Sequence, residues 1–192
     1  MMSLSTASSR GLKRNKNEDH ILVNQLLNTF IITDGIGESA RHAPKPGKIA
    51  ALAALRAISE SSADEKARAL LEEAMAAANL ALLKHSCDIG TSLRSTILIG
   101  LIKQEDFHLG NVGDTRAYLI RSDEIKRLTV DHSLAAEFSK EDCVERYQDL
   151  TSQVLTKALG ASLSVQGDHV SARISPRDMV VMCTDGVWRI LG

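Results

Sequence analysis

Two apolar stretches of this sequence end on the same tripeptide, Thr-Asp-Gly. The first copy places Asp34 and Gly35 after a strand-like run, and the second places Asp185 and Gly186 after another run near the C-terminus. Such runs are typical of buried strands, and a glycine lets the backbone turn sharply where a strand leaves the core. A carboxylate on a rigid strand end, beside an uncovered carbonyl, suits a hard divalent cation that takes oxygen ligands. One copy alone is typical of a hairpin turn, so it is the repetition that favours a metal site.

Further carboxylates and one arginine stand at other expected strand ends. The acidic pair Glu18-Asp19 precedes the first copy, and Asp114 lies in a tight Gly-Asp-Thr turn. Two hard metal ions that share a carboxylate can hold a hydroxide, which attacks phosphorus in line. Arg14 stands five residues before Asp19, and its planar guanidinium suits a phosphate bound through two oxygens. Taken singly, Arg14 is typical of a surface arginine and Asp114 of an Asx turn. Together, these residue types predict metal-assisted hydrolysis of a phosphoester.

The composition is that of an ordinary globular protein. The chain has 192 residues, of which 44% are hydrophobic and 24% charged, and we expect a single domain spanning residues 1–192. A formal net charge of −1 gives no electrostatic reason to bind nucleic acid or an anionic membrane. The aromatic content of 3% also argues against surfaces on which bases stack. We therefore expect a soluble monomer with neither nucleic acid nor a membrane as its partner.

The cysteines and the N-terminal segment favour a cytoplasmic protein. Cys87, Cys143 and Cys183 are far apart and show no C-x-x-C spacing, which argues against a disulfide framework or a zinc site. Residues 1–11 are rich in serine and threonine and contain no apolar segment of the kind found in signal peptides. The longest uncharged apolar stretch, near residues 96–102, is too short to span a bilayer.

The periodicity predicts an α+β fold. Strands are expected at residues 20–24, around Phe30, and at 95–103, 107–112, 116–120, 125–128, 170–174 and 179–183, with helices at 48–59 and 64–85. Asp64 is the expected N-cap of the second helix, and Pro44 and Pro46 exclude regular helix from residues 41–47. Residues 131–153 show a mixed pattern of helix and loop. Short polar turns between the strands indicate antiparallel pairing, and the alanine-rich helices are suited to packing on a sheet.

Seven motifs stand in a fixed order along the chain. They are Gly11-x-x-Arg14-x-x-Asn17-Glu18-Asp19, Thr33-Asp34-Gly35-Ile36-Gly37, Ser95-Thr96, Gly113-Asp114-Thr115-Arg116-Ala117-Tyr118, Leu128-Thr129-x-Asp131-His132-Ser133, Leu155-Thr156-x-Ala158-Leu159-Gly160 and Cys183-Thr184-Asp185-Gly186-Val187-Trp188. This ordered set resembles the PP2C (PPM) family of metal-dependent protein serine/threonine phosphatases, above all its compact bacterial members. The resemblance runs from about Gly11 to the last residue.

The resemblance implies a fold, a metal centre and a substrate. The fold would be an α-β-β-α sandwich of two antiparallel sheets flanked by helices, holding two or three Mn²⁺ or Mg²⁺ ions. The implied ligands are Asp34 as the bridge between two metals, the Gly35 carbonyl, Asp185 on the second metal, Glu18 and Asp19 through water, and Asp114 with Asp185 at a more labile third metal. Arg14 would bind the substrate phosphate. The implied substrate is a phosphorylated protein, namely a serine/threonine kinase or a target of one.

Three departures from the family pattern affect these expectations. Glu38 adds a negative charge where a second glycine is common, and Ile36 stands where some members carry a histidine proposed as the general acid. Water would then have to protonate the leaving alkoxide. The chain also ends at Gly192, before the family's Asp-Asn motif, whose aspartate ligates a metal. For a C-terminally incomplete domain we expect reduced stability and exposed apolar area around Trp188. The alternative function is a non-catalytic module that binds a phosphoprotein or a regulatory partner.

Other motifs are weaker. Residues 35–40 match the dinucleotide fingerprint G-x-G-x-x-A, but prolines interrupt the helix that this fingerprint needs, and nearby carboxylates would repel phosphates. Cys183 and Arg189 have the spacing of a cysteine-dependent phosphatase loop, which Asp185 inside that loop opposes. For residues 131–133, Asp-His-Ser, we expect structural capping and no chemistry.

Overall fold

The largest element of the fold is a five-stranded antiparallel sheet with the strand order β1-β2-β5-β6-β9. The computed structural model describes residues 2–12, 14–36, 45–62, 64–137 and 154–191. The strands of this sheet are β1 (His20–Asn24), β2 (Thr29–Thr33), β5 (Ile97–Lys103), β6 (Asp106–Val112) and β9 (Asp168–Arg173). β2 and β5 lie inside the sheet and are almost wholly buried, which explains their continuous apolar sequences.

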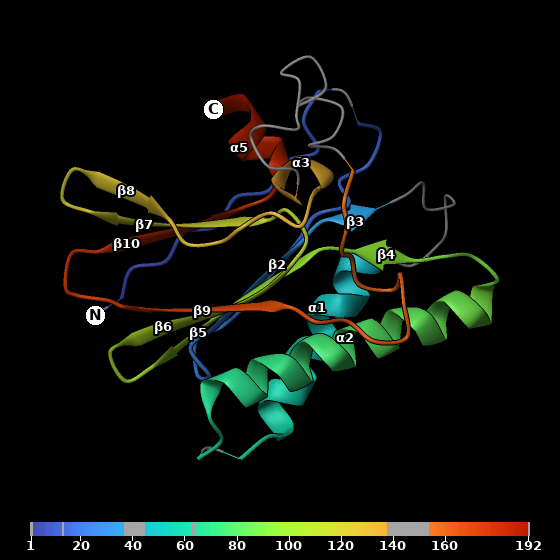
Figure 1. Cartoon of the computed structure of the whole chain (residues 1–192), viewed down its shortest axis with the longest axis horizontal. Helices are drawn as coiled ribbons and strands as arrows, with labels where there is room; N and C mark the ends of the chain where they lie inside the picture. The colour runs from blue at the N-terminus through green and yellow to red at the C-terminus, as the bar shows by residue number, and fades with distance from the viewer. Residues whose placement is uncertain (1, 13, 37–44, 63, 138–153, 192) are drawn as a thin grey trace.

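A second, smaller sheet packs against the first. It has three strands in the order β10-β7-β8, namely β10 (Met179–Cys183), β7 (Arg116–Arg121) and β8 (Glu124–Arg127). A short pair, β3 (Gly35–Ile36) with β4 (Arg94–Ser95), extends from one end of the sandwich. Figure 1 shows the two sheets stacked, with the smaller sheet on the side away from the long helices.

Two long helices cover the outer face of the five-stranded sheet (Figure 1). They are α1 (Pro46–Glu60) and α2 (Ala67–Ile89), and their alanines bring both helices close to the strands. One apolar cluster fills this layer, including Ala54, Leu71 and Leu82 from the helices and Ile99 from β5, each almost completely buried. A second cluster, with Phe30, Leu98 and Phe107 among its members, fills the space between the two sheets. The fold is therefore a helix layer on two stacked sheets.

Two short helices, α3 (Leu134–Glu137) and α5 (Asp185–Leu191), lie at the end of the sandwich where β2 and β10 finish (Figure 1). On α5, Trp188 is buried, whereas Val187, Ile190 and Leu191 are exposed. The exposed apolar area expected near Trp188 is therefore present, but it comes from the neighbours of Trp188. Among the described residues, no helix is both long and apolar enough to cross a membrane.

The predicted strands and both long helices are confirmed, with three local differences. α1 begins at Pro46, because proline is tolerated in the first turn of a helix, where no backbone donor is needed. α2 begins after Lys66 without a side-chain cap, so the prediction of Asp64 as the N-cap was wrong. The strand predicted at residues 95–103 is interrupted at Thr96, which leaves the ladder to bond Asp34. Most of the mixed segment, residues 138–153, lies outside the described residues.

Candidate metal centre

The register of the first hairpin brings two of the predicted carboxylates together. His20 at the start of β1 pairs with Thr33 at the end of β2. Asp19 and Asp34, the residues just outside this pair, therefore lie side by side at one edge of the sheet. The prediction from the sequence that this hairpin places them at neighbouring ends is confirmed. The two side chains are close enough that the charge of Asp19 adds to the effect of burial in raising the pKa of Asp34.

The second Thr-Asp-Gly copy reaches the same place from the other sheet. Cys183 at the end of β10 pairs with Arg116 at the start of β7. Asp185 follows β10 and Asp114 precedes β7, so the two aspartates lie at the same end of the smaller sheet. Thr184 joins this end to the first sheet, because its hydroxyl donates a 3.0 Å hydrogen bond to a carboxylate oxygen of Asp19. The carboxylates at positions 19, 34, 114 and 185 thus meet at one end of the sandwich.

The backbone of Asp34 is held from both sides. Its N–H donates to the Thr96 hydroxyl at 2.9 Å, and its carbonyl accepts from the Thr96 N–H and the Ser95 hydroxyl, each at 2.9 Å. The Thr96 hydroxyl also lies 2.9 Å from that of Thr115, the residue after Asp114. These buried contacts fix the positions of Asp34 and Asp114 relative to each other, which gives the Ser95-Thr96 motif a structural role.

Two glycines allow the close approach of backbones at this site. A Cβ on Gly35 would lie 3.2 Å from both the Cβ and the carbonyl oxygen of Glu18, whose carbonyl accepts a 3.3 Å hydrogen bond from the Gly35 N–H. Gly113 has φ +114°, and a Cβ there would lie 2.5 Å from the Thr96 methyl carbon. Larger residues would therefore displace the neighbours that position Asp34 and Asp114.

The carboxylates are partly buried and repel one another. Burial raises the pKa of Asp34 to about 8, and the negative charges of Asp19, Asp185 and Asp114 contribute to the shift. Burial, followed by the charges of Asp185 and Asp131, raises the pKa of Asp114 to about 6. Burial also raises the pKa of Asp19, against the hydrogen bond from Thr184. A group of oxygen ligands with this mutual repulsion is chemically suited to a divalent cation.

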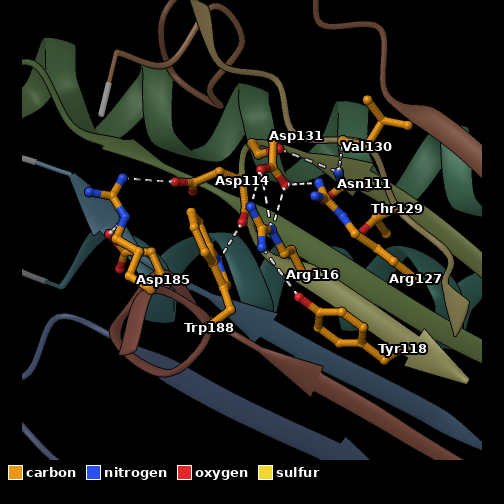
Figure 2. A network of polar contacts seen from close by, with 12 residues as sticks. Asn111, Asp114, Arg116, Tyr118, Arg127, Thr129, Val130, Asp131, Asp185 and Trp188 are labelled. Carbon is orange, nitrogen blue, oxygen red and sulfur yellow. Dashed lines mark hydrogen bonds and ion pairs between the residues drawn. The ribbon is translucent and has the colours of Figure 1, made fainter. Parts of the chain in front are cut away.

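Besides Asp185, helix α5 contributes Trp188 and Arg189, to which the sequence assigned no role at the metal site. The Trp188 indole N–H donates to the Asp114 carbonyl at 3.0 Å. Arg189 places Nε 3.2 Å from an oxygen of Asp185 and Nη2 3.7 Å from an oxygen of Asp114. Figure 2 shows Asp114, Asp185 and Trp188 in this arrangement. Asp185 and Arg189 are four residues apart on a helix, and this spacing was the available sequence signal.

An ion-pair network centred on the buried Asp131 lies behind Trp188 (Figure 2). The Arg116 guanidinium stacks on the Trp188 ring at 3.4 Å and forms a forked pair with Asp131, its closest N–O distance being 2.7 Å. Arg127 also pairs with Asp131. His132 accepts a 3.0 Å hydrogen bond from the Gly113 N–H through Nδ1. Ser133 directly precedes α3, and its carbonyl accepts hydrogen bonds from the N–H groups of Ala136 and Glu137, as expected for a capping position. Ion pairing by Asp131 and support of the Gly113 turn by His132 add to the structural role that was predicted for residues 131–133.

All predicted site residues line one cleft of about 1670 Å³, including Arg14, Glu18, Asp19, Asp34, Gly35, Asp114 and Asp185. Arg14 is exposed on the wall of this cleft. Within the described parts of the chain, no group of three or more His, Cys, Asp or Glu side chains is already gathered tightly enough to hold a metal ion.

Glu38 and the rest of the dinucleotide-like stretch, residues 37–40, lie outside the described residues. For Cys183, burial raises the thiol pKa, which is the opposite of what a cysteine nucleophile needs.

Comparison with known proteins decides the family. Residues 4–155, most of the chain, match the family described as Protein phosphatase 2C. The chain belongs to this family. The serine/threonine phosphatase stp of Listeria innocua is 26% identical over 203 residues, which cover 96% of this chain and 77% of the relative. The PP2C recognition and the enzyme class of a metal-dependent protein phosphatase are confirmed.

Solved structures have the same fold as this PP2C chain. The PPM Ser-Thr phosphatase MsPP from Mycobacterium smegmatis, in complex with cacodylate, superposes with a TM-score of 0.79 at 26% identity, covering 95% of this chain and 77% of the other. The catalytic domain of PstP with two manganese ions has a TM-score of 0.74 at 23% identity, covering 95% and 76%. The predicted α+β sandwich of two antiparallel sheets is confirmed.

Proposed function

We propose that this PP2C chain hydrolyses phosphoserine and phosphothreonine in proteins at the cleft lined by its converging carboxylates. The observation that carries the proposal is the meeting of Asp19, Asp34, Asp114 and Asp185 from two sheets at one end of the sandwich. Strand ends are rigid supports, so these oxygens keep fixed relative positions. The relatives named as serine/threonine phosphatases support this substrate class.

Divalent ions, Mn²⁺ or Mg²⁺, fit the chemistry of this donor set. Asp34, Asp185 and the Gly35 carbonyl would hold the core pair, Glu18 and Asp19 would act through water, and Asp114 with Asp185 would hold a third, weaker ion. The raised pKa values of Asp34 and Asp114 support the assignment, because burial and then the charges of neighbouring carboxylates disfavour their ionised forms, which a bound cation would stabilise. When bound, the ions supply an activated water and neutralise phosphate charge. The catalytic domain of PstP, which shares this fold and binds two manganese ions, supports the choice of metal.

The chain's own residues would bind and orient the phosphoryl group. Arg14, on the exposed wall of the cleft, has the planar guanidinium that pairs with two phosphate oxygens. The Thr184 hydroxyl keeps the Asp19 carboxylate turned toward the cleft. Ile36 cannot donate a proton, so solvent in the open cleft would protonate the leaving serine or threonine oxygen. The protein substrate would be a serine/threonine kinase or its target, and the enzyme would act as a cytoplasmic monomer.

The test is hydrolysis of a phosphothreonine peptide, with and without Mn²⁺, by the chain and its Asp34→Asn variant. We expect Mn²⁺-dependent phosphate release that falls at least about a thousandfold in Asp34→Asn, since the substitution removes a charged metal ligand. Asp123→Asn is the matched control. Asp123 is exposed in the turn between β7 and β8, outside the cleft, so this variant should retain full activity.

Three results would count against the proposal. Activity that is equal with and without Mn²⁺ would exclude the metal centre, and unchanged activity of Asp34→Asn would exclude its location. A folded chain that binds Mn²⁺ yet releases no phosphate would favour the non-catalytic alternative, a module that binds a phosphoprotein. An Arg14→Ala variant tests the proposed phosphate contact of Arg14, because loss of that contact should raise KM for the peptide about tenfold.

A further inference from the structure

We propose that Arg189 regulates the metal centre by occupying, with its guanidinium, the position between Asp114 and Asp185 and competing there with a divalent ion. The inference rests on the proposed function, in which these two carboxylates share the most weakly held ion. Arg189 is then a positioning residue that makes binding of this ion conditional on its own displacement.

The geometry places one cation across two carboxylates from different elements. Arg189 reaches Asp185 through Nε at 3.2 Å along one turn of α5, and Asp114, which precedes β7, through Nη2 at 3.7 Å. The Asp114 side chain is only 7% exposed, whereas that of Arg189 is 28% exposed. The guanidinium therefore contacts a shielded carboxylate, Asp114, and a more open one, Asp185, which is 33% exposed, while its flexible stem keeps access to solvent.

Trp188 holds this arrangement in place. Its indole N–H donates to the Asp114 carbonyl, and its ring lies between two guanidinium groups, 3.4 Å from the Cζ of Arg116 and 5.2 Å from that of Arg189. Asp131 fixes Arg116 from behind with a forked ion pair. Figure 2 shows this series of contacts from Asp131 through Arg116 and Trp188 to Asp114. The ring is thus fixed by contacts from Asp131 through Arg116 to Trp188 and Asp114 that do not involve the Arg189 side chain.

The charges explain why the guanidinium and an ion exclude each other. Burial raises the pKa of Asp114 and the charge of Asp185 raises it further, whereas the positive charge of Arg189 opposes the shift. Arg189 therefore already compensates part of the negative charge that would attract a cation. A divalent ion placed between the same two carboxylates would lie close to the guanidinium, and like charges at that distance repel strongly in a partly buried site. Binding of the ion requires Arg189 to turn outward.

The experiment is a titration of the full chain, freed of metal by chelation, with Mn²⁺ alone, followed by calorimetry and by the electron paramagnetic resonance of free Mn²⁺. Arg189→Met removes the charge and the guanidinium but keeps an unbranched apolar stem, and Arg189→Lys keeps the charge but loses the fork. We expect Arg189→Met to tighten the weakest Mn²⁺ site about tenfold and Arg189→Lys to remain within about threefold of the parent. Arg56→Met, on the exposed face of α1, is the control and should match the parent.

Each outcome separates this inference from the proposed function. A parent chain that binds no Mn²⁺ overturns the proposed function and the inference with it. Mn²⁺ binding by the parent that is unchanged or weakened in Arg189→Met overturns the inference alone. Unchanged Mn²⁺ binding together with a higher KM for the phosphopeptide would make Arg189 a substrate contact and also overturn it. Near-ultraviolet circular dichroism checks the fold, and Arg189→Gln replaces Arg189→Met if the latter unfolds.

Discussion

The layer beneath α1 and α2 and the carboxylate end of the sandwich are built on opposite physical rules. In the first, apolar side chains such as Leu71, Leu82 and Ile99 are almost completely buried and contain no polar atom that needs a partner. In the second, Asp34 and Asp114 are largely buried with raised pKa values, so their charged forms are disfavoured in the fold. The apolar layer therefore stabilises the fold, whereas the carboxylate end destabilises it.

The same strands connect the two regions, which explains how the cost is tolerated. β2 contributes Ile31 to the helix-covered layer and leads directly into Asp34. β6 is anchored between β5 and β9 and leads into Asp114. Because the apolar parts of these strands fix the backbone, the repulsion between carboxylates cannot be relieved by moving the strands apart. The site is held in place by packing that lies several residues away from it.

The largest expected effect on stability comes from the helix-covered layer. Leu82→Ala should lower the free energy of unfolding by about 3 kcal/mol, because the side chain is fully buried and its loss leaves a cavity. Chemical denaturation measures this loss, and Mn²⁺ affinity at a temperature where the variant is folded should be unchanged. An equal loss of Mn²⁺ affinity would show that the two regions are not separable.

The opposite sign is expected at the carboxylate end. Asp34→Asn in the presence of a chelator should raise the free energy of unfolding by about 2 kcal/mol, since it removes a charge that burial and neighbouring carboxylates disfavour. Denaturation of both proteins in the chelator measures the gain, with Asp123→Asn as the control of no effect. A destabilised Asp34→Asn chain would mean that the hydrogen bonds of the Asp34 carboxylate stabilise the parent more than repulsion by the neighbouring carboxylates destabilises it.

A pH titration of the metal-free chain sharpens the same contrast. Burial and the neighbouring carboxylates raise the pKa of Asp34 to about 8 in the fold, from its ordinary value of 3.8. The folded state therefore binds a proton that the unfolded state does not, and stability rises as pH falls from about 9 to about 7, by about 1 kcal/mol. Thermal unfolding across this range measures the slope. The slope should be lost in Asp34→Asn; a slope that persists there belongs to another group.

The smallest effect is expected on the outer surface of the helix layer. Arg56 pairs with Glu60 at 2.8 Å along α1, but their side chains are 78% and 62% exposed. Solvent screens such a pair, so Arg56→Ala should change the free energy of unfolding by no more than about 0.5 kcal/mol. Chemical denaturation of Arg56→Ala and Leu82→Ala under the same conditions measures both changes in the free energy of unfolding. A loss above about 1 kcal/mol would show that this exposed face contributes to the stability of the layer.

The local pattern of the sequence was sufficient for the strands, the long helices and the carboxylates at strand ends. Alternating and continuous apolar runs determine where strands lie, and a hairpin with short turns brings Asp19 next to Asp34 whatever the rest of the chain does. The motif order then indicated the PP2C family, which the comparisons confirmed. The metal ligands and the role of Arg14 remain predictions.

The tertiary structure alone decided which distant side chains meet these carboxylates. Thr96 bonds the backbone of Asp34 across 62 positions, and Trp188 bonds the Asp114 carbonyl across 74. Such contacts depend on sheet register and on the direction in which α5 leaves β10, and neither is encoded in a local period. For the same reason the sequence by itself determined the residue types of the site, whereas only the packing of two sheets decided that Arg189 faces Asp114.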